Sequence, residues 1–165
     1  MRHPDCSRRT LNQLLGCLPL LAFAGCASRP APAPRSLKAA QAGSDIALFA
    51  LSLLDLPYAS GGRGPATGFD CSGLVSHVYL LGAGIRLQGS AAAMAKALHP
   101  VSPAELLAGD LVFFNTLGYA FSHVGIYLGE GRFVHASNPR TGVRVDRLDN
   151  NYYAARFEGA KTIWG

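Results

Sequence analysis

The pattern of apolar residues changes at Asp110, and this change limits the chain to one broad class of fold. Upstream, apolar residues recur at helical spacing over 46–54 and 74–81. Downstream, short runs rich in Val, Ile, Phe and Tyr are separated by Gly, Asn and Pro. These runs cover 111–114, 123–128, 132–136, 143–148 and 161–164. Helices followed by antiparallel strands predict an α+β domain with N-terminal helices packed on an antiparallel sheet.

The first 25 residues have the composition of an export signal. A positively charged start is followed by an apolar stretch over 11–23, which is shorter than the roughly 20 residues that cross a bilayer. Small residues then lead into Cys26, as in a lipoprotein signal, where the cysteine is acylated and becomes the new N-terminus. Ala27 resembles an outer-membrane sorting signal, which predicts lipid anchoring on the periplasmic side of that membrane. An ordinary cleaved signal without a lipid is the alternative.

The rest of the chain has room for one domain, because a single core takes about 100 to 200 residues. Residues 26–43 are rich in Pro and Ala and predict an extended tether that follows the lipidated Cys26. The catalytic domain is then predicted over 44–165, starting with a helix that Ser44 or Asp45 caps. Residues 26–165 have 12 Lys+Arg and 9 Asp+Glu, and the resulting net charge of +3 is spread without runs. It suits an anionic envelope polymer, whereas binding to nucleic acid would require a clustered basic patch.

Of the four cysteines, only one is a candidate nucleophile. Cys6 and Cys17 would be removed with the signal, and lipidation would occupy Cys26, so Cys71 alone would carry a free thiol. An exported protein reaches a disulfide-forming compartment, where a single thiol has no internal partner. A chemical role is therefore predicted for Cys71. A buried, inert cysteine that acts as a small apolar residue is the alternative.

The position of Cys71 suggests how its thiol would be activated. The residue lies in the first turn of the predicted helix over 71–81, with Asp70 as N-cap. Free backbone N–H groups and the positive end of the helix dipole favour a thiolate, so a lowered pKa is expected. The charge of Asp70 opposes this effect.

His123 and His135 are predicted to meet on one face of a hairpin. If the turn is the three-residue loop 129–131, Gly125 faces His135 and His123 lies diagonally across from it. A two-residue loop would instead place the histidines on opposite faces. A cysteine, a histidine base and a second polar residue that orients the base form the minimal unit for thiol catalysis. His123 is the predicted base and His135 the predicted orienting residue.

Three segments carry a resemblance to a known family. They are FDCSGLV over 69–75, GDLVFF over 109–114 and SHVGIY over 122–127. In this order and spacing they closely resemble the NlpC/P60 family, over about 48–164. The resemblance implies a papain-like core and a monomeric enzyme that hydrolyses peptides of peptidoglycan with a Cys71, His123 and His135 triad, without cofactor or metal. It places Tyr58 near the oxyanion site, and Asp70 and Ser72 are predicted beside it as oxyanion or substrate-binding residues.

The sequence departs from the family pattern at one point, and two alternatives to a thiol hydrolase remain open. Family members often carry an arginine in the segment that corresponds to Leu87–Met94, and this chain lacks it, so the sequence leaves open which stem-peptide or cross-link bond is cut. Cys71, His123 and His135 are also ordinary zinc ligands, so a zinc site is one alternative. The other is a catalytically silent envelope lipoprotein that binds peptidoglycan.

Overall fold

The computed structural model describes residues 35–164. The predicted export signal, the acylation of Cys26 and the first part of the tether lie outside these residues. Within the described part, no helix is both long and apolar enough to cross a membrane.

Four α-helices and one 3₁₀ turn make up the helical part of the described chain. They are α1 (Leu37–Leu51), α2 (Cys71–Ala83), α3 (Ala91–Ala97), the 3₁₀ turn Pro103–Glu105 and α4 (Asn151–Ala154). The predicted start of the first helix at Ser44 or Asp45 is wrong. The N-cap is Ser36, whose hydroxyl accepts a hydrogen bond from the Ala39 N–H at 3.2 Å. Residues 37–43, which the sequence assigned to the tether, are therefore helical, and the folded domain begins before residue 44.

The strands form a six-stranded antiparallel sheet and a separate two-stranded ribbon. The sheet has the order β3-β8-β4-β5-β6-β7. Its strands are β3 (His99–Val101), β4 (Leu111–Phe114), β5 (His123–Gly129), β6 (Arg132–Ala136), β7 (Val143–Arg147) and β8 (Phe157–Thr162), and the ribbon pairs β1 (Arg63–Gly64) with β2 (Gly68–Phe69). The predicted α+β class is confirmed. The bounds of the strand predicted over 161–164 are wrong. β8 runs over Phe157–Thr162, and only Ala160 and Thr162 in it are buried, so its apolar signal is weak.

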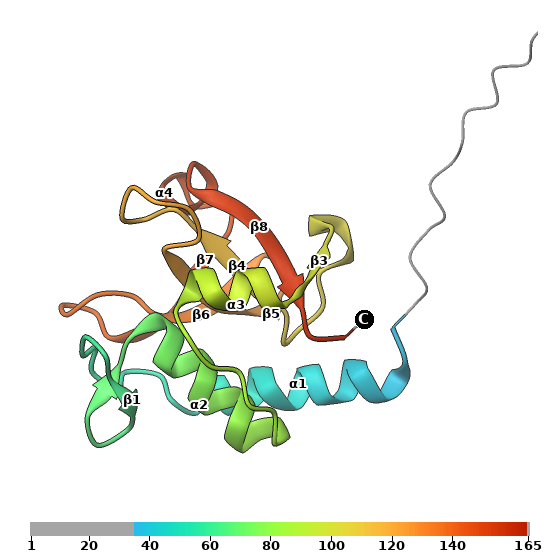
Figure 1. Ribbon diagram of the computed structural model, residues 1–165, viewed down its shortest axis with the longest axis horizontal. Helices are drawn as coiled ribbons and strands as arrows, with labels where there is room; N and C mark the ends of the chain where they lie inside the picture. The colour runs from blue at the N-terminus through green and yellow to red at the C-terminus, as the bar shows by residue number, and fades with distance from the viewer. Residues whose placement is uncertain (1–34, 165) are drawn as a thin grey trace, which may run out of the picture. The chain divides into compact units, whose positions relative to one another are not determined.

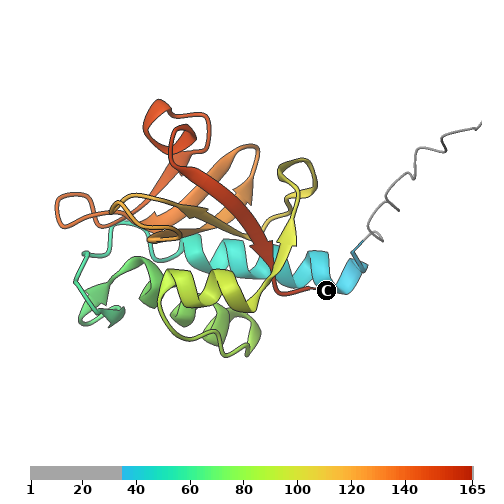
Figure 2. The same cartoon turned by 45° about the horizontal axis from the view of Figure 1, so that its top comes forward.

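The helices cover one face of the sheet. Figures 1 and 2 show α1, α2 and α3 gathered on the same side of the strands. Successive residues of β4 alternate between two apolar clusters, with Leu111 and Phe113 facing the helices and Val112 and Phe114 facing Tyr153 of α4. This period of two is the signature of a strand buried on both faces. The core therefore fixes β4 and β5 against α2, and α2 carries Cys71 at its first position.

Asp110 fastens the start of β4 to the N-terminal end of the described chain. Its Oδ2 accepts a hydrogen bond from the Leu107 N–H at 2.8 Å, and its Oδ1 pairs with the Arg35 guanidinium at 2.6 Å. The carboxylate is fully buried. Asp110 therefore caps the turn that leads into β4.

The start of α2 is held against the preceding glycine-rich loop. Asp70 N–H donates to the Gly62 carbonyl at 3.0 Å, and a Cβ on Gly73 would lie 1.9 Å from the same carbonyl oxygen. Only glycine at position 73 permits this approach between loop and helix. The close approach therefore helps to set where the first turn of α2, and with it Cys71, is placed.

We expect Gly73→Ala to lower the free energy of unfolding by about 1–3 kcal/mol, because the added methyl group meets backbone and not a movable side chain. Gly64→Ala is the matched control, since a Cβ there has no neighbour within 4 Å among the described residues. Urea unfolding of both variants measures the difference. Equal stability of the two variants would contradict the packing described here.

Candidate active site

Asp70 organises the first turn of α2 around Cys71. Its Oδ1 accepts hydrogen bonds from the Gly73 N–H at 2.6 Å and from the Ser72 hydroxyl at 3.0 Å, and its Oδ2 accepts one from the Gly61 N–H at 3.0 Å. The predicted N-cap is confirmed. The Asp70 side chain therefore holds the loop to the helix, and the Ser72 hydroxyl is already engaged by Asp70.

The pKa of the Cys71 thiol is raised, which is opposite to the expected direction. Burial is the main cause, and the charge of Asp70 adds to it. The backbone N–H groups of Val124, Ser72 and Cys71 lower the pKa but do not outweigh burial. The effect of Val124 also locates the sulfur, because this residue follows His123 at the start of β5. The helix terminus alone therefore does not produce a thiolate in the free domain.

His123 and His135 lie on the same face of the sheet, as predicted, although the turn between them differs from the prediction. β5 and β6 pair Ile126 with Val134 and Tyr127 with Phe133, the register that brings the histidines together. The loop, however, contains two residues, because Gly129 already pairs with Arg132. A bulge between Tyr127 and Gly129 inserts one extra residue and restores the register. The predicted three-residue loop is therefore wrong, while the predicted relation of the histidines is confirmed.

The two imidazoles and Asp146 form a chain of hydrogen bonds. His123 Nε2 lies 2.6 Å from His135 Nδ1, and His135 Nε2 lies 2.9 Å from Asp146 Oδ2. Because an ionised carboxylate only accepts, His135 carries its proton on Nε2 and presents Nδ1 as an acceptor. His123 then donates from Nε2 and has a free lone pair on Nδ1. The partners thus assign both tautomers, and the second nitrogen of His123 is left as a base.

Asp146 is itself held and kept ionised. Arg144 Nη2 donates to Asp146 Oδ1 at 2.9 Å, which leaves Oδ2 for His135. Burial alone would raise the pKa of Asp146, but the hydrogen bond from His135 and the charge of Arg144 lower it below its ordinary value. Asp146 was missed in the sequence. The β6–β7 register could have identified it. This register pairs His135 with Arg144, so Asp146, two residues further along β7, lies on the same face of the sheet as His135 and diagonally across from it.

Both histidines are neutral at physiological pH. Burial, followed by the neighbouring His135, lowers the pKa of His123 to about 3. Burial also lowers the pKa of His135, against the opposing effect of Asp146. His135 is fully buried and His123 nearly so. The site therefore pairs a neutral thiol with a neutral imidazole, and the proton must move when substrate is present.

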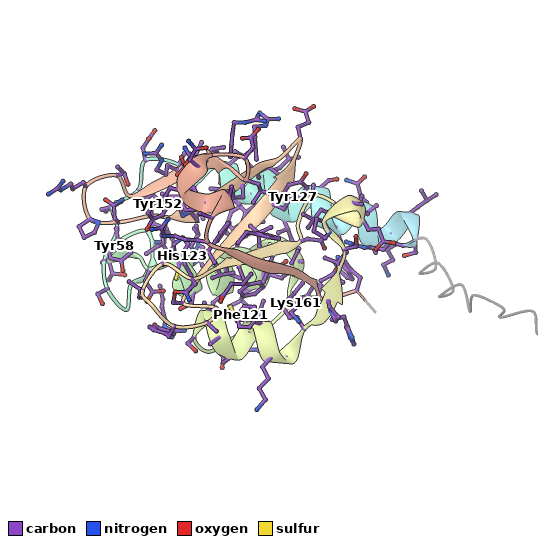
Figure 3. The ribbon with its side chains drawn as sticks, turned by 90° about the horizontal axis from the view of Figure 1, so that it is seen from above. Tyr58, Phe121, His123, Tyr127, Tyr152 and Lys161 are labelled. Atoms are coloured by element: carbon purple, nitrogen blue, oxygen red, sulfur yellow. The ribbon has the colours of Figure 1, made fainter. Side chains whose placement is uncertain are left out.

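Tyr58 lies beside the thiol. It forms an isolated parallel bridge with Phe69, two residues before Cys71. Burial raises the pKa of Tyr58, and Cys71 and Asp70 act in the same direction. Figure 3 shows Tyr58 and His123 at the same end of the domain. Tyr58, Asp70, Cys71 and Ser72 therefore lie at or next to the start of α2, and His123 lies at the start of β5, hydrogen-bonded to His135.

The geometry does not favour a zinc site. The nitrogens of His123 and His135 that face one another are 2.6 Å apart and hydrogen-bonded, so they have no room for an ion between them. Zinc lies about 2.0–2.1 Å from each nitrogen ligand, and two such ligands are therefore well separated. Across residues 35–164, no group of three or more His, Cys, Asp or Glu side chains is arranged to hold a metal ion.

The site thus combines a thiol at the start of α2 with two hydrogen-bonded histidines on an α+β scaffold. Residues 55–162 match the model of the NlpC/P60 family. The chain belongs to the NlpC/P60 family.

The similar proteins include curated relatives and solved domains. The chain is 40% identical over 112 residues to the murein DD-endopeptidase MepH of Escherichia coli, which covers 65% of this chain and 41% of MepH. It is 38% identical over 109 residues to the gamma-DL-glutamyl hydrolase of Bacillus subtilis, covering 66% of this chain and 26% of the relative. It thus spans well under half of either relative. The NlpC/p60 domain of the peptidoglycan hydrolase SagA superposes with a TM-score of 0.63 at 33% identity, over 73% of this chain and 97% of that domain.

The buried histidines predict a pH-dependent stability. An unfolded histidine titrates near pH 6.5, whereas His123 in the folded domain titrates at about 3. Between these values the unfolded chain binds more protons, so the stability contributed by neutral His123 is complete above about pH 6.5 and is lost as the pH falls. We expect the free energy of unfolding to drop by about 1.4 kcal/mol per pH unit from this residue. Urea unfolding between pH 7 and 5 measures it.

His123→Gln should flatten that dependence, because glutamine does not titrate. His99→Gln, a change at an exposed position of β3, is the control and should leave the slope unchanged. Parallel slopes for the wild type and His123→Gln would show that His123 is not buried as a neutral group.

Proposed function

We propose that this protein is a peptidoglycan endopeptidase that cuts peptide bonds of stem peptides or of their cross-links, with Cys71 as nucleophile. The observation that carries the proposal is the continuous chain from His123 through His135 to Asp146, which leaves His123 Nδ1 free as a base on the strand that contacts Cys71. The printed names of MepH, the gamma-DL-glutamyl hydrolase and SagA support the substrate class. The names of the two relatives differ in the bond they describe, so we assign the class and not the bond.

In the first half-reaction, the Cys71 sulfur attacks the carbonyl carbon of the scissile bond while His123 Nδ1 takes the thiol proton. The carbonyl oxygen gains the negative charge, and in this proposal backbone N–H groups at the start of α2 and the Tyr58 hydroxyl stabilise it. The C–N bond then breaks as His123 returns the proton to the leaving amine, and an acyl-enzyme on Cys71 remains.

In the second half-reaction, His123 Nδ1 removes a proton from water, and the resulting hydroxide attacks the acyl carbon. The thiolate of Cys71 leaves and recovers its proton from His123. His135 holds His123 in one orientation throughout and shares the transient positive charge of the imidazolium. Because the free thiol has a raised pKa, this transfer by a general base is the step that activates sulfur.

The placement of the protein in the cell is also part of the proposal. We place it in the bacterial envelope, as a monomer carried by a lipid on Cys26 at the periplasmic side of the outer membrane. The composition of residues 1–27 supports the anchor, and the pairing of Arg35 with Asp110 ties the chain to the fold just before α1. Radiolabelled fatty acid incorporated by the wild type and not by Cys26→Ala tests the anchor.

Digestion of defined muropeptides tests the proposed activity. Wild type and Cys71→Ala are incubated with cross-linked and monomeric muropeptides, and the products are identified by mass spectrometry. We expect products from the wild type alone, loss of activity after iodoacetamide and no effect of a chelator. If the wild type leaves both substrates unchanged but pellets with sacculi, a peptidoglycan-binding module replaces this proposal.

Asp146→Asn tests the positioning role of Asp146. An asparagine amide can donate to His135 Nε2, which would put the His135 proton on Nδ1 and leave His123 in the wrong tautomer. We expect kcat to fall by about 100-fold or more, with KM within about twofold of the wild type. Steady-state kinetics on one muropeptide, together with a pH–rate profile, measure the effect.

Asp149→Asn is the matched control. Arg147 pairs with Asp149 at the same sequence spacing as Arg144 with Asp146, but both partners are largely exposed and contact neither histidine. We expect its kcat to match the wild type. An equal loss of kcat in the two variants, or none in Asp146→Asn, would remove Asp146 from the mechanism.

A further inference from the structure

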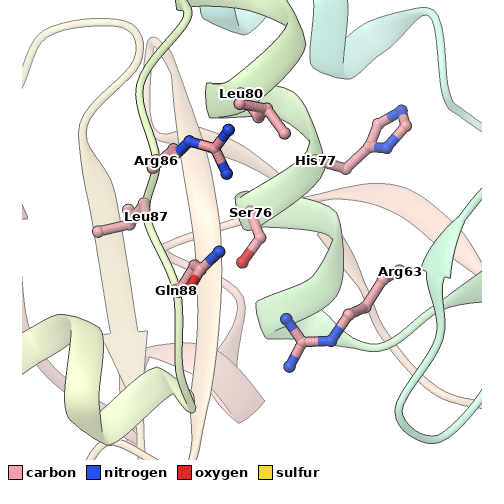
Figure 4. Close-up of a pocket in the computed structure, with 7 residues that line it drawn as sticks. All are labelled: Arg63, Ser76, His77, Leu80, Arg86, Leu87 and Gln88. Atoms are coloured by element: carbon pink, nitrogen blue, oxygen red, sulfur yellow. The ribbon is translucent and has the colours of Figure 1, made fainter.

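A pocket of about 190 Å³ lies on the side of α2 that is turned away from the proposed nucleophile. Three residues that line it, Ser76, His77 and Leu80, belong to α2 (Figure 4). They follow Cys71 by five, six and nine positions, which places them about 140° to 240° round the helix from it. This pocket therefore does not border the Cys71 thiol, and the surface beside the base His123 is the one that meets a substrate.

The loop between β4 and β5, which leads directly to His123, has an exposed apolar tip. Residues 115–122 contain no charged side chain. Residues 117–120, the apolar tip, are all exposed, and Leu117 and Tyr119 in it are 68% and 57% exposed. Single exposed apolar residues are common on protein surfaces, but an exposed run of four is unfavourable unless it has a function. The apolar tip therefore has the properties of a contact surface.

The loop is held in one conformation although its tip is exposed. The Ser122 hydroxyl accepts hydrogen bonds from the N–H groups of Thr116 and Leu117 at 2.9 and 3.1 Å. Phe121 has a φ of 52°, a conformation that is strained for a bulky residue, and its N–H donates to the Glu158 carboxylate of β8. A surface that is already ordered loses little conformational entropy when a ligand binds to it.

The loop borders the proposed active site on the side of the sheet where Cys71 lies. Ser122, which binds the backbone of the tip, directly precedes His123. Phe121 packs against the helix-facing core cluster, as Cys71 and Tyr58 also do. In the view of Figure 3, His123 lies between Tyr58 and Phe121. The base is therefore flanked by the Tyr58 segment on one side and by this loop on the other.

The short path from the tip to His123 limits which part of a substrate the tip can touch. Leu117 N–H is bonded to the Ser122 side chain, so the tip begins within about 10 Å of the His123 backbone. An extended peptide advances about 3.3 Å per residue, so the contact falls within about three residues of the scissile bond. An uncharged apolar surface matches the aliphatic part of such a peptide and offers no partner to its carboxylates.

We propose that the apolar tip, through Leu117 and Tyr119, binds uncharged aliphatic residues of the peptide substrate within about three residues of the bond that Cys71 attacks. Tyr119 supplies a large, stiff contact surface at a low cost in side-chain entropy. The inference rests on the proposed endopeptidase function and names the part of the substrate that the loop recognises, which is the peptide and not the sugar strand.

Binding and kinetics of loop variants test this contact surface. The probes are a synthetic stem peptide without sugars and the same peptide attached to its disaccharide. Calorimetry on the full chain with Cys71→Ala gives Kd without turnover, and the chain with Cys71 gives KM and kcat. In both backgrounds the tip double variant, Leu117→Ala with Tyr119→Ala, is compared with Leu37→Ala with Leu81→Ala. This control removes two exposed leucines, one at the start of α1 and one near the end of α2.

We expect the tip double variant to raise Kd and KM by about tenfold or more for both probes, with kcat within about threefold of the wild type. Tyr119→Phe should bind like the wild type, because the contact is made by the ring and not by the hydroxyl. The control double variant should match the wild type. Melting temperatures of all variants should agree, because the four substituted side chains are exposed.

The possible failures are distinguishable. Unchanged Kd and KM in the tip double variant, an equal loss in the control, or an equal loss in Tyr119→Phe would overturn the contact surface. So would a loss confined to the probe that carries the disaccharide, which would assign the tip to the sugar. If no peptide is cut but binding of the sugar-free peptide still depends on the tip, the contact surface stands and the endopeptidase function is what fails.

Discussion

The hydrogen bond between Asp146 and His135 determines the chemistry of the whole site. It fixes the proton of His135 on Nε2, and this single assignment leaves Nδ1 to receive the proton of His123 Nε2. Reversing it would place a proton on the nitrogen of His123 that has to act as a base. Arg144 completes the chain by engaging the second oxygen of Asp146. Asp146 lies on β7, the edge strand of the sheet, and acts through His135 on the protonation of His123 Nδ1.

The sheet and the helices contribute different halves of this arrangement. β5, β6 and β7 supply the base and the groups behind it at fixed register, while α2 supplies the thiol at its first residue. The halves meet because the core packs α2 on β5, and because the glycine contact between residues 62 and 73 sets the start of the helix. Burial of the joined site has a cost, since it raises the pKa of Cys71 and lowers that of His123. It also keeps both groups neutral in the folded domain.

Much of this could be predicted from local sequence, and the errors have identifiable causes. The position of Cys71 in the first turn and the Asp70 cap follow from helix-start patterns within a few residues, and the pairing of the histidines follows from strand alternation. The turn was wrong because a bulge and a shorter loop produce the same register as a longer loop, so the pattern of side chains alone cannot separate them. The direction of the Cys71 pKa depends on how deeply β5 covers the sulfur, which is a tertiary property. Asp146 depends on the β6–β7 register, which the turn over 137–142 sets through the Ser137 to Gly142 hydrogen bond.

The central claim is that a neutral imidazole pair, oriented by Asp146, presents His123 Nδ1 as the base. Nitrogen-15 NMR of the histidine side chains in the full-length protein at pH 7 tests it directly. The account predicts that His123 and His135 are each protonated on Nε2 and bare on Nδ1. A proton on Nδ1 of His123, whether in the other neutral tautomer or in an imidazolium, would contradict it.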